Sequence, residues 1–165
     1  MIVGFASCGD DAGDEDGTTT TPGVDSDGSA DTEKESENVV IETEVHIEIS
    51  EGGPQTGDPQ GGGKVLDGSS LGDSPFCPGG TFRDRHGDAE IGLVDRTFRC
   101  SGGSLRIGFT PGVPEDPQTQ NGPWNVVSGT GDFEGIQGHG EMEIKYEPGT
   151  HGSEGRETFT GTIVQ

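Results

Sequence analysis

The sequence predicts an all-β fold: a small antiparallel barrel of roughly seven or eight strands, or a β-sandwich, preceded by a disordered acidic tether. Three observations support this prediction. Several short segments alternate apolar and polar residues with the period of two that is typical of strands buried on one face. The 32 glycines are concentrated in clusters between these segments, as tight turns require. No segment longer than a turn has the spacing of an amphipathic helix.

The formal net charge of −22 and the hydrophobic share of 25% limit the partners of this chain. Binding a phosphate backbone needs clustered Lys and Arg, whereas the nine basic residues are scattered along the sequence. The same charge opposes adhesion to anionic lipid head groups. We therefore expect no nucleic-acid partner.

Segment 9–37 is too acidic and too polar to fold alone. It holds eleven Asp and Glu, one Lys and three hydrophobic residues. Such a segment cannot bury enough apolar surface to offset its chain entropy, so we expect a disordered spacer extended by self-repulsion. Part of it alternates carboxylates as calcium loops do, but Ala30 and Ser36 stand where such a loop needs Gly and Glu. A solvated spacer is the preferred interpretation.

The first residues place two small side chains before a cysteine. Ala6 and Ser7 precede Cys8, and the acidic segment follows at once. This arrangement resembles the signal of a bacterial lipoprotein, which implies lipidation of Cys8, attachment to the cell membrane and an extracytoplasmic location on the bacterial cell surface. Because the apolar segment is short for such a signal, we expect the true start to lie upstream. The alternative is a cytosolic thiol near a disordered N-terminus.

These features divide the chain into three segments. Residues 1–8 are the truncated lipoprotein signal, 9–37 the disordered acidic linker and 38–165 the β domain. The clearest strand lies at 39–50, where apolar residues and a threonine share one face. Its inward residues are Ile41, Thr43, Val45, Ile47 and Ile49.

Further strands are expected along the rest of the domain, with polar loops between them. The hairpin over 92–110 turns at Ser101-Gly102-Gly103. The other expected strands are 64–71, a strand after the turn at 76–82, 124–130, 138–146 and 156–164, and the expected loops are 51–63, 83–88 and 111–123.

Cys77 and Cys100 are the cysteines that remain in this domain. In an exported protein a disulfide between them is the expected state. It would contribute roughly 3–4 kcal/mol through the entropy of the unfolded chain. A metal site is the alternative, but no His stands near either cysteine.

The segment Gly129-Thr-Gly-Asp-Phe-Glu-Gly-Ile-Gln-Gly138 resembles an element of the allene oxide cyclase and dirigent families. The resemblance extends over about 35 residues to the closing strand, and the whole chain looks closest to small actinobacterial lipoproteins with such a domain. It implies an eight-stranded antiparallel barrel with an apolar cavity, positive φ at two glycines and a phenylalanine plugging one end. The motif residues are Gly129, Thr130, Gly131, Phe133, Gly135 and Gly138.

A barrel of this size can hold one small ligand or be packed shut. Apolar residues from several expected strands would line its interior. These residues are Ile47, Leu105, Ile107, Trp124, Met142 and Phe159.

No catalytic motif is evident, and we assign no catalytic residue, metal ligand or cofactor. His46, His86, His139 and His151 have no metal-ligand spacing. His86, between Asp84 and Asp88, would be an acid–base candidate or part of a charged surface loop, and the latter is preferred. The ionisable residues that could point inward are Asp95, Arg96, Arg106 and Glu157, but the register that decides their face is not fixed by the sequence.

Three functions fit these residues. The preferred one is a non-catalytic binding or interaction module for a small apolar ligand or an envelope partner, of unknown oligomeric state. The second is a cyclase- or dirigent-like enzyme that guides an apolar intermediate in its cavity. The third is a purely structural envelope protein. A charged pair inside a solvent-reachable cavity would favour the enzyme, and a cavity filled by side chains would favour the structural protein.

Overall fold

A computed structural model describes residues 35–48, 57, 59–88, 90–114, 116 and 118–165, and its regular structure there is all β. No described segment forms a helix with the length and hydrophobicity needed to cross a bilayer. The strands are β1 (Ser36–Ile47), β2 (Pro59–Val65), β3 (Ser70–Leu71), β4 (Ser74–Pro75), β5 (Thr81–His86), β6 (Val94–Cys100), β7 (Gly103–Phe109), β8 (Thr119–Gly131), β9 (Gln137–Tyr146) and β10 (Glu154–Val164).

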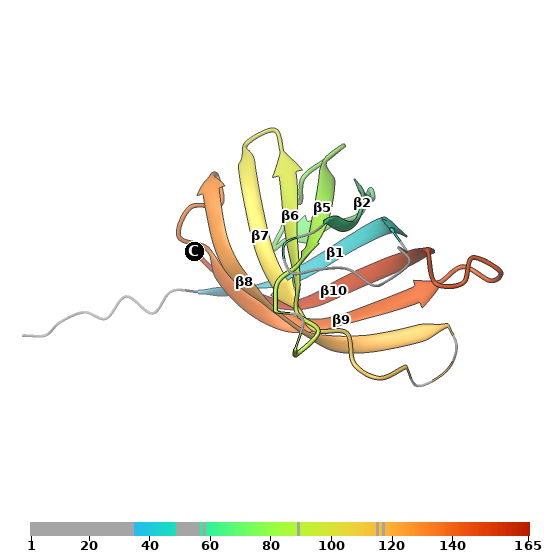
Figure 1. The fold of residues 1–165 in the computed structure, drawn as a ribbon. Coiled ribbons are helices and arrows are strands. Elements are labelled where there is room, and N and C mark those ends of the chain that lie inside the picture. The colour runs from blue at the N-terminus through green and yellow to red at the C-terminus, as the bar shows by residue number, and fades with distance from the viewer. Residues whose placement is uncertain (1–34, 49–56, 58, 89, 115, 117) are drawn as a thin grey trace, which may run out of the picture. The chain divides into compact units, whose positions relative to one another are not determined.

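Eight of these strands close into an antiparallel barrel in the order β1-β2-β5-β6-β7-β8-β9-β10 (Figure 1). Closure comes from β1, which pairs with β10 along nearly its whole length, from Ser36 opposite Val164 to His46 opposite Glu154. The short β3–β4 hairpin adds to β1 beside β2. The predicted barrel is therefore confirmed, and the sandwich is not formed. Closure leaves no long unpaired edge among the barrel strands.

Most of the predicted strands are confirmed, and the differences have physical reasons. β1 begins at Ser36, inside the segment expected to be linker, and Ile49 lies outside the described residues. The loop expected at 51–63 is wrong at its end, because β2 starts at Pro59. Glycine is required inside β2, because a Cβ at Gly63 would lie 1.9 Å from the carbonyl oxygen of Glu44. Such a close approach between two backbones explains why glycine occurs inside this strand.

Two other expected loops are shorter than predicted. The polar segment 83–88 was expected to be a loop, but β5 continues to His86 because Asp84 is paired inside the barrel. β8 begins at Thr119, within the expected loop 111–123. Pairing with β7 starts only at Trp124, so Pro123 lies where a missing N–H is tolerated.

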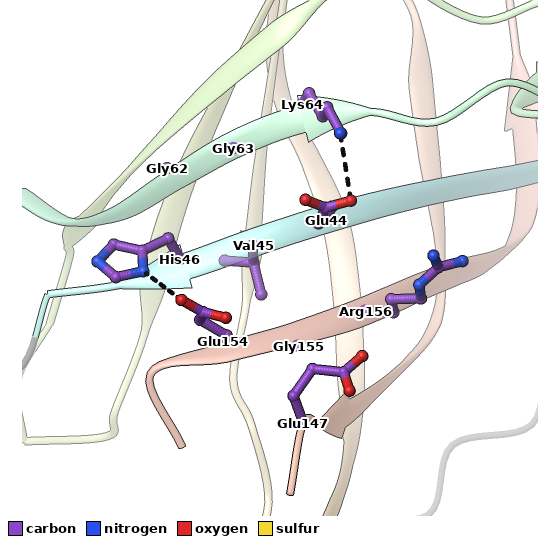
Figure 2. A pocket seen from close by; sticks show the side chains of 10 residues that line it. All are labelled: Glu44, Val45, His46, Gly62, Gly63, Lys64, Glu147, Glu154, Gly155 and Arg156. Atoms are coloured by element: carbon purple, nitrogen blue, oxygen red, sulfur yellow. Dashed lines mark ion pairs between the residues drawn. The ribbon is translucent and has the colours of Figure 1, made fainter. Parts of the chain in front are cut away.

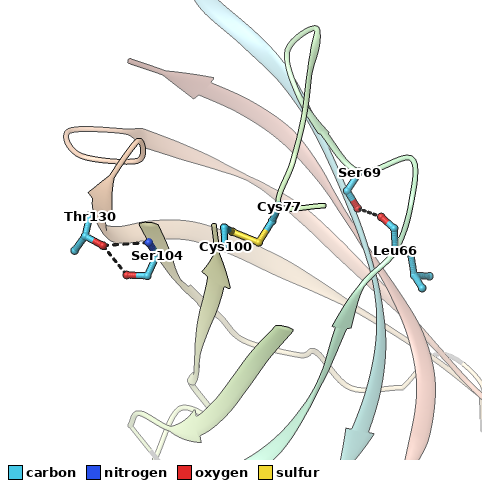
Figure 3. The surroundings of a disulfide bond; sticks show 6 residues. All are labelled: Leu66, Ser69, Cys77, Cys100, Ser104 and Thr130. Carbon is cyan, nitrogen blue, oxygen red and sulfur yellow. Dashed lines mark hydrogen bonds between the residues drawn. A yellow bond between two sulfur atoms is a disulfide. The ribbon is translucent and has the colours of Figure 1, made fainter. Parts of the chain in front are cut away.

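One end of the barrel, here called the sealed end, is filled by aromatic side chains and closed by a disulfide. Phe76 lies edge to face against Phe98 and Phe133, with ring centroids 5.2 and 5.8 Å apart. The Cys77–Cys100 disulfide joins the segment before β5 to the end of β6, which confirms the predicted bond (Figure 3). These edge-to-face contacts stabilise the sealed end in addition to the burial of the apolar surface of the rings.

The sealed end also carries the motif that resembles the cyclase and dirigent families. β8 ends at Gly131, whose φ is +63°, and Gly135 has a φ of +79°. Gly129 lacks the positive φ expected of it. It is instead required by close packing, since a Cβ there would lie 1.9 Å from the carbonyl oxygen of Phe133. Phe133 is buried, as an end plug must be.

Hydrogen bonds hold the neighbouring strands together at the same end. Thr130 Oγ1 accepts a hydrogen bond from the backbone N–H of Ser104 at 3.1 Å and lies 2.8 Å from its hydroxyl (Figure 3). Gly138 follows the turn in β9. Deeper inside, Trp124 Nε1 donates to the carbonyl of Thr160 in β10 at 3.0 Å, which satisfies the one polar atom of a buried indole.

Candidate functional site

A buried ion-pair cluster lies between the packed core and the opposite end of the barrel. Arg96 points inward from β6 and is 0% exposed. It donates to both oxygens of Asp84 in β5, from Nε at 2.7 Å and from Nη2 at 2.6 Å, and its Nη1 donates to Oε2 of Glu157 in β10. Thr43 in β1 donates to the same Oε2 at 2.8 Å. The bidentate pair is the geometry in which guanidinium and carboxylate interact most strongly.

Aromatic rings surround the guanidinium of Arg96. Its central carbon lies 3.8 Å from the ring centroid of Phe82, 5.0 Å from that of Phe109 and 5.2 Å from that of Phe159. These are cation–π distances in a site without water contact. Burial opposes the charge, but attraction to Asp84 and Glu157 outweighs it and raises the pKa of Arg96, so the side chain stays charged.

The two carboxylates of the cluster share a single cation. Burial raises the pKa of Glu157; Arg96 and the hydroxyl of Thr43 oppose this rise, while the charge of Asp84 adds to it. Burial is the largest of these effects, because it removes water from the ionised carboxylate, and the single cation Arg96 also has to balance the bidentate Asp84. Protonation of Glu157 is therefore favoured relative to an ordinary glutamate.

A cavity of about 480 Å³ opens above this cluster at the other end of the barrel, here called the open end. Asp84 and Glu157 belong to its lining, whereas Arg96 does not. The exposed His151 and Gly92 also line it, so the cavity reaches solvent. Its apolar wall consists of Ile47, Val94, Phe109, Pro111, Met142 and Ile144.

Polar side chains stand around the same cavity. The hydroxyl of Tyr146 donates to Oε1 of Gln120. Burial and the charge of Glu157 raise the pKa of Tyr146, so the phenol keeps its proton. Gln60 also lines the cavity, and its side-chain oxygen is buried with no hydrogen-bond partner among the described residues. A buried acceptor without a partner is costly, and this one belongs to a residue of the cavity lining.

The residues expected to line the interior divide into two groups. Ile47 and Met142 line the cavity. Leu105, Ile107, Trp124 and Phe159 are buried in the packed core below it and do not belong to the cavity lining.

The ionisable candidates also divide by the face of the sheet. Arg96 and Glu157 point inward, whereas Arg106 and Asp95 pair with each other on the outer face at 2.8 Å. Asp84 was missed as an inward residue because its segment was interpreted as a loop. Phe82 is buried, and continued alternation from Phe82 would have placed Asp84 on the same face.

The histidines and the lipidation candidate do not join this cluster. His86 ends β5, with a buried Nδ1 that has no partner in the described part of the chain. His46 and His139 are exposed on β1 and β9. Within the described ranges, no group of three or more His, Cys, Asp or Glu could hold a metal ion. Cys8 lies outside the described residues.

A larger depression, about 630 Å³, lies on the outer face of β1, β2 and β10. Figure 2 shows its side chains, with Glu44 paired to Lys64 at 3.3 Å and His46 to Glu154 at 3.8 Å. These four side chains are more than half exposed, and interactions between such exposed charges are weak because water screens them. The interior cavity is the better candidate site despite its smaller volume.

Comparison of this chain with protein-family models, with curated proteins and with solved structures gave no match. The candidate site therefore rests on the chain's own geometry.

Proposed function

We propose that this barrel binds one small, largely apolar molecule in the cavity at its open end. The observation that carries the proposal is the cavity itself: about 480 Å³ with an apolar wall and a few polar groups at its floor. Ligand sites in proteins combine these features at volumes of roughly 300–1,000 Å³. A purely structural barrel would gain stability by filling this space, as the sealed end does with Phe76 and Phe133.

The proposal includes display outside the cell membrane. A lipid on Cys8 would anchor the chain, and the acidic segment 9–37 would hold the barrel away from the surface. The disulfide supports this location, because such bonds persist mainly in oxidising compartments.

Native mass spectrometry of the full chain, exported through an oxidising compartment, tests cavity binding. We expect an apolar adduct on the wild type that is lost in Ile144→Trp, whose larger ring would occupy the cavity that Ile144 lines. The matched control is Val127→Trp, since Val127 is exposed on β8 and should retain the adduct. An adduct that survives Ile144→Trp with the fold intact by circular dichroism, or a wild type that takes up none of a panel of apolar ligands, would refute the proposal.

A second candidate function is a cyclase- or dirigent-like enzyme, and one observation favours it: Glu157 and Tyr146 line the same solvent-reachable cavity. A cyclisation of this kind neither adds atoms to the intermediate nor removes them. The cavity would hold one conformation of the intermediate, and Glu157 would exchange a proton with it. The test is the handedness of product from an apolar substrate that also cyclises spontaneously. We expect an enantiomeric excess with the wild type and less with Glu157→Gln; a racemic product with the wild type would exclude this candidate.

A further inference from the structure

The floor of the cavity exposes carboxylates and hides their counter-ion. Asp84 and Glu157 belong to the lining, while Arg96 is 0% exposed and lies behind them. A molecule entering from the open end therefore meets negative groups first. The outer pairs, such as Glu44 with Lys64, present both partners to solvent instead.

The cluster also carries more negative than positive charge. Asp84 uses both oxygens on Arg96, and Oε2 of Glu157 accepts from Arg96 and Thr43. No described residue gives a hydrogen bond to Oε1 of Glu157, which leaves this oxygen for a ligand. One guanidinium faces two carboxylates, so ionisation of Glu157 leaves one negative charge unmatched. Burial disfavours this charge in the empty cavity, and a bound cation would balance it.

Other lining groups add acceptors rather than cations. The buried oxygen of Gln60 has no partner among the described residues. His151 is the one basic side chain among the described lining residues, and it is exposed. Among the described lining residues, the hydroxyl donor of Tyr146 is already bonded to Gln120, whereas Oε1 of Glu157 and Oε1 of Gln60 accept no hydrogen bond from a described residue.

We propose that the ligand of this barrel is an amphiphilic amine, with its ammonium group bound at Glu157 and its apolar part against the wall formed by Phe109, Met142 and Ile144. This inference rests on the proposed binding function and names its ligand class. An ammonium supplies the missing positive charge and donates to Oε1 of Glu157, whereas a carboxylate of the same size meets like charge. The chain's net charge of −22 further attracts cations toward the barrel.

Isothermal titration of the full chain with three ligands that share one ring system tests the inference. Tryptamine is a cation at neutral pH, tryptophol is neutral and indoleacetate is an anion. We expect tryptamine to bind at least about tenfold more tightly than tryptophol, because hydrogen bonds to charged groups are about twice as strong as neutral ones, and indoleacetate to bind most weakly.

Two variants locate the effect. Glu157→Gln removes the cavity charge and should bring tryptamine to the affinity of tryptophol, with tryptophol itself unchanged. Glu44→Gln removes one charge from the outer face and should leave the preference intact. Equal binding of all three ligands by the wild type would overturn the amine inference and leave cavity binding standing. A preference that survives Glu157→Gln would also overturn it. Binding of none would count against the proposed function as well.

Discussion

The two ends of this barrel are built from the same strands and yet differ in what they contain. At the sealed end, inward positions carry large aromatic side chains, and a disulfide ties the segment before β5 to β6. At the open end, the same inward alternation presents Gln120 and Tyr146 around a cavity, and the register shift between Pro59 and Gly61 brings Gln60 to its lining. Period-two alternation therefore decides which residues point inward, while their volume and polarity decide whether the interior is packed or open.

Arg96 and its two carboxylates mark the boundary between these ends. On one side the guanidinium contacts aromatic rings, and on the other the carboxylates line the cavity. A buried ion pair adds little net stability over a well-packed apolar replacement, but loss of one partner is costly. We therefore expect the sealed end to supply stability, and the cluster to supply polarity at the cavity floor at the expense of stability.

The largest effect should follow removal of the cation at this boundary. Arg96→Met leaves Asp84 and Glu157 buried without their partner and should destabilise the barrel by up to about 5 kcal/mol, measured by urea unfolding. Arg106→Met is the matched control, because Arg106 pairs with Asp95 on the outer face and should cost no more than about 1 kcal/mol. Similar losses in the two variants would mean that the buried carboxylates do not depend on Arg96 for the stability of the folded protein.

A slightly smaller loss is expected from a cavity at the sealed end. Phe76→Ala removes a buried ring that contacts Phe98 and Phe133, and should cost about 4 kcal/mol. Tryptamine affinity at the open end should stay unchanged, because Phe76 does not line that cavity. Ile91→Ala, at an exposed position, should be nearly neutral in unfolding experiments. A parallel loss of affinity in Phe76→Ala would show that the two ends are coupled.

Loss of the disulfide should have the next largest effect. Replacing Cys77 and Cys100 together by Ser removes a cross-link between residues 23 apart in sequence, and should cost roughly 3 kcal/mol. Reduction of the wild type should give the same loss of stability. If the double variant and the reduced wild type unfold at the same urea concentration as the oxidised wild type, the disulfide contributes nothing to the stability of the sealed end.

The sequence predicts the barrel well because its longest strands have one apolar, buried face and one polar, exposed face. Val39, Ile41 and Val45 of β1 alternate with charged or exposed residues, and all three are buried as this pattern implies. The disulfide follows from counting the cysteines of the domain. Most of β2 was missed because three successive glycines, at 61–63, form its centre and glycine carries no hydropathy pattern; the expected strand 64–71 included only its last two residues.

The site was harder to predict than the fold, since polar residues at inward positions break the pattern that identifies strands. Arg96 and Glu157 were recognised as candidates for inward positions, together with Asp95 and Arg106, which face outward. Only the register separates these pairs, and register depends on pairing across the sheet rather than on one strand. The cavity results from side-chain volumes of many strands at one end, which no single segment encodes.

The smallest and most specific effect concerns pH. Because the pKa of Glu157 is raised above its ordinary value of 4.5, the folded protein keeps a proton there that the unfolded chain releases. In the window from pH 4.5 upward to the raised pKa, this group therefore makes the folded state less stable as the pH rises. Gln cannot titrate, so the stability of the wild type relative to Glu157→Gln should be greatest near pH 4.5 and should fall toward neutral pH. Urea unfolding of both proteins across this window measures the difference, in which the other titrating groups largely cancel. A difference that instead grows toward neutral pH would mean that Arg96 stabilises the ionised form of Glu157 more than burial disfavours it.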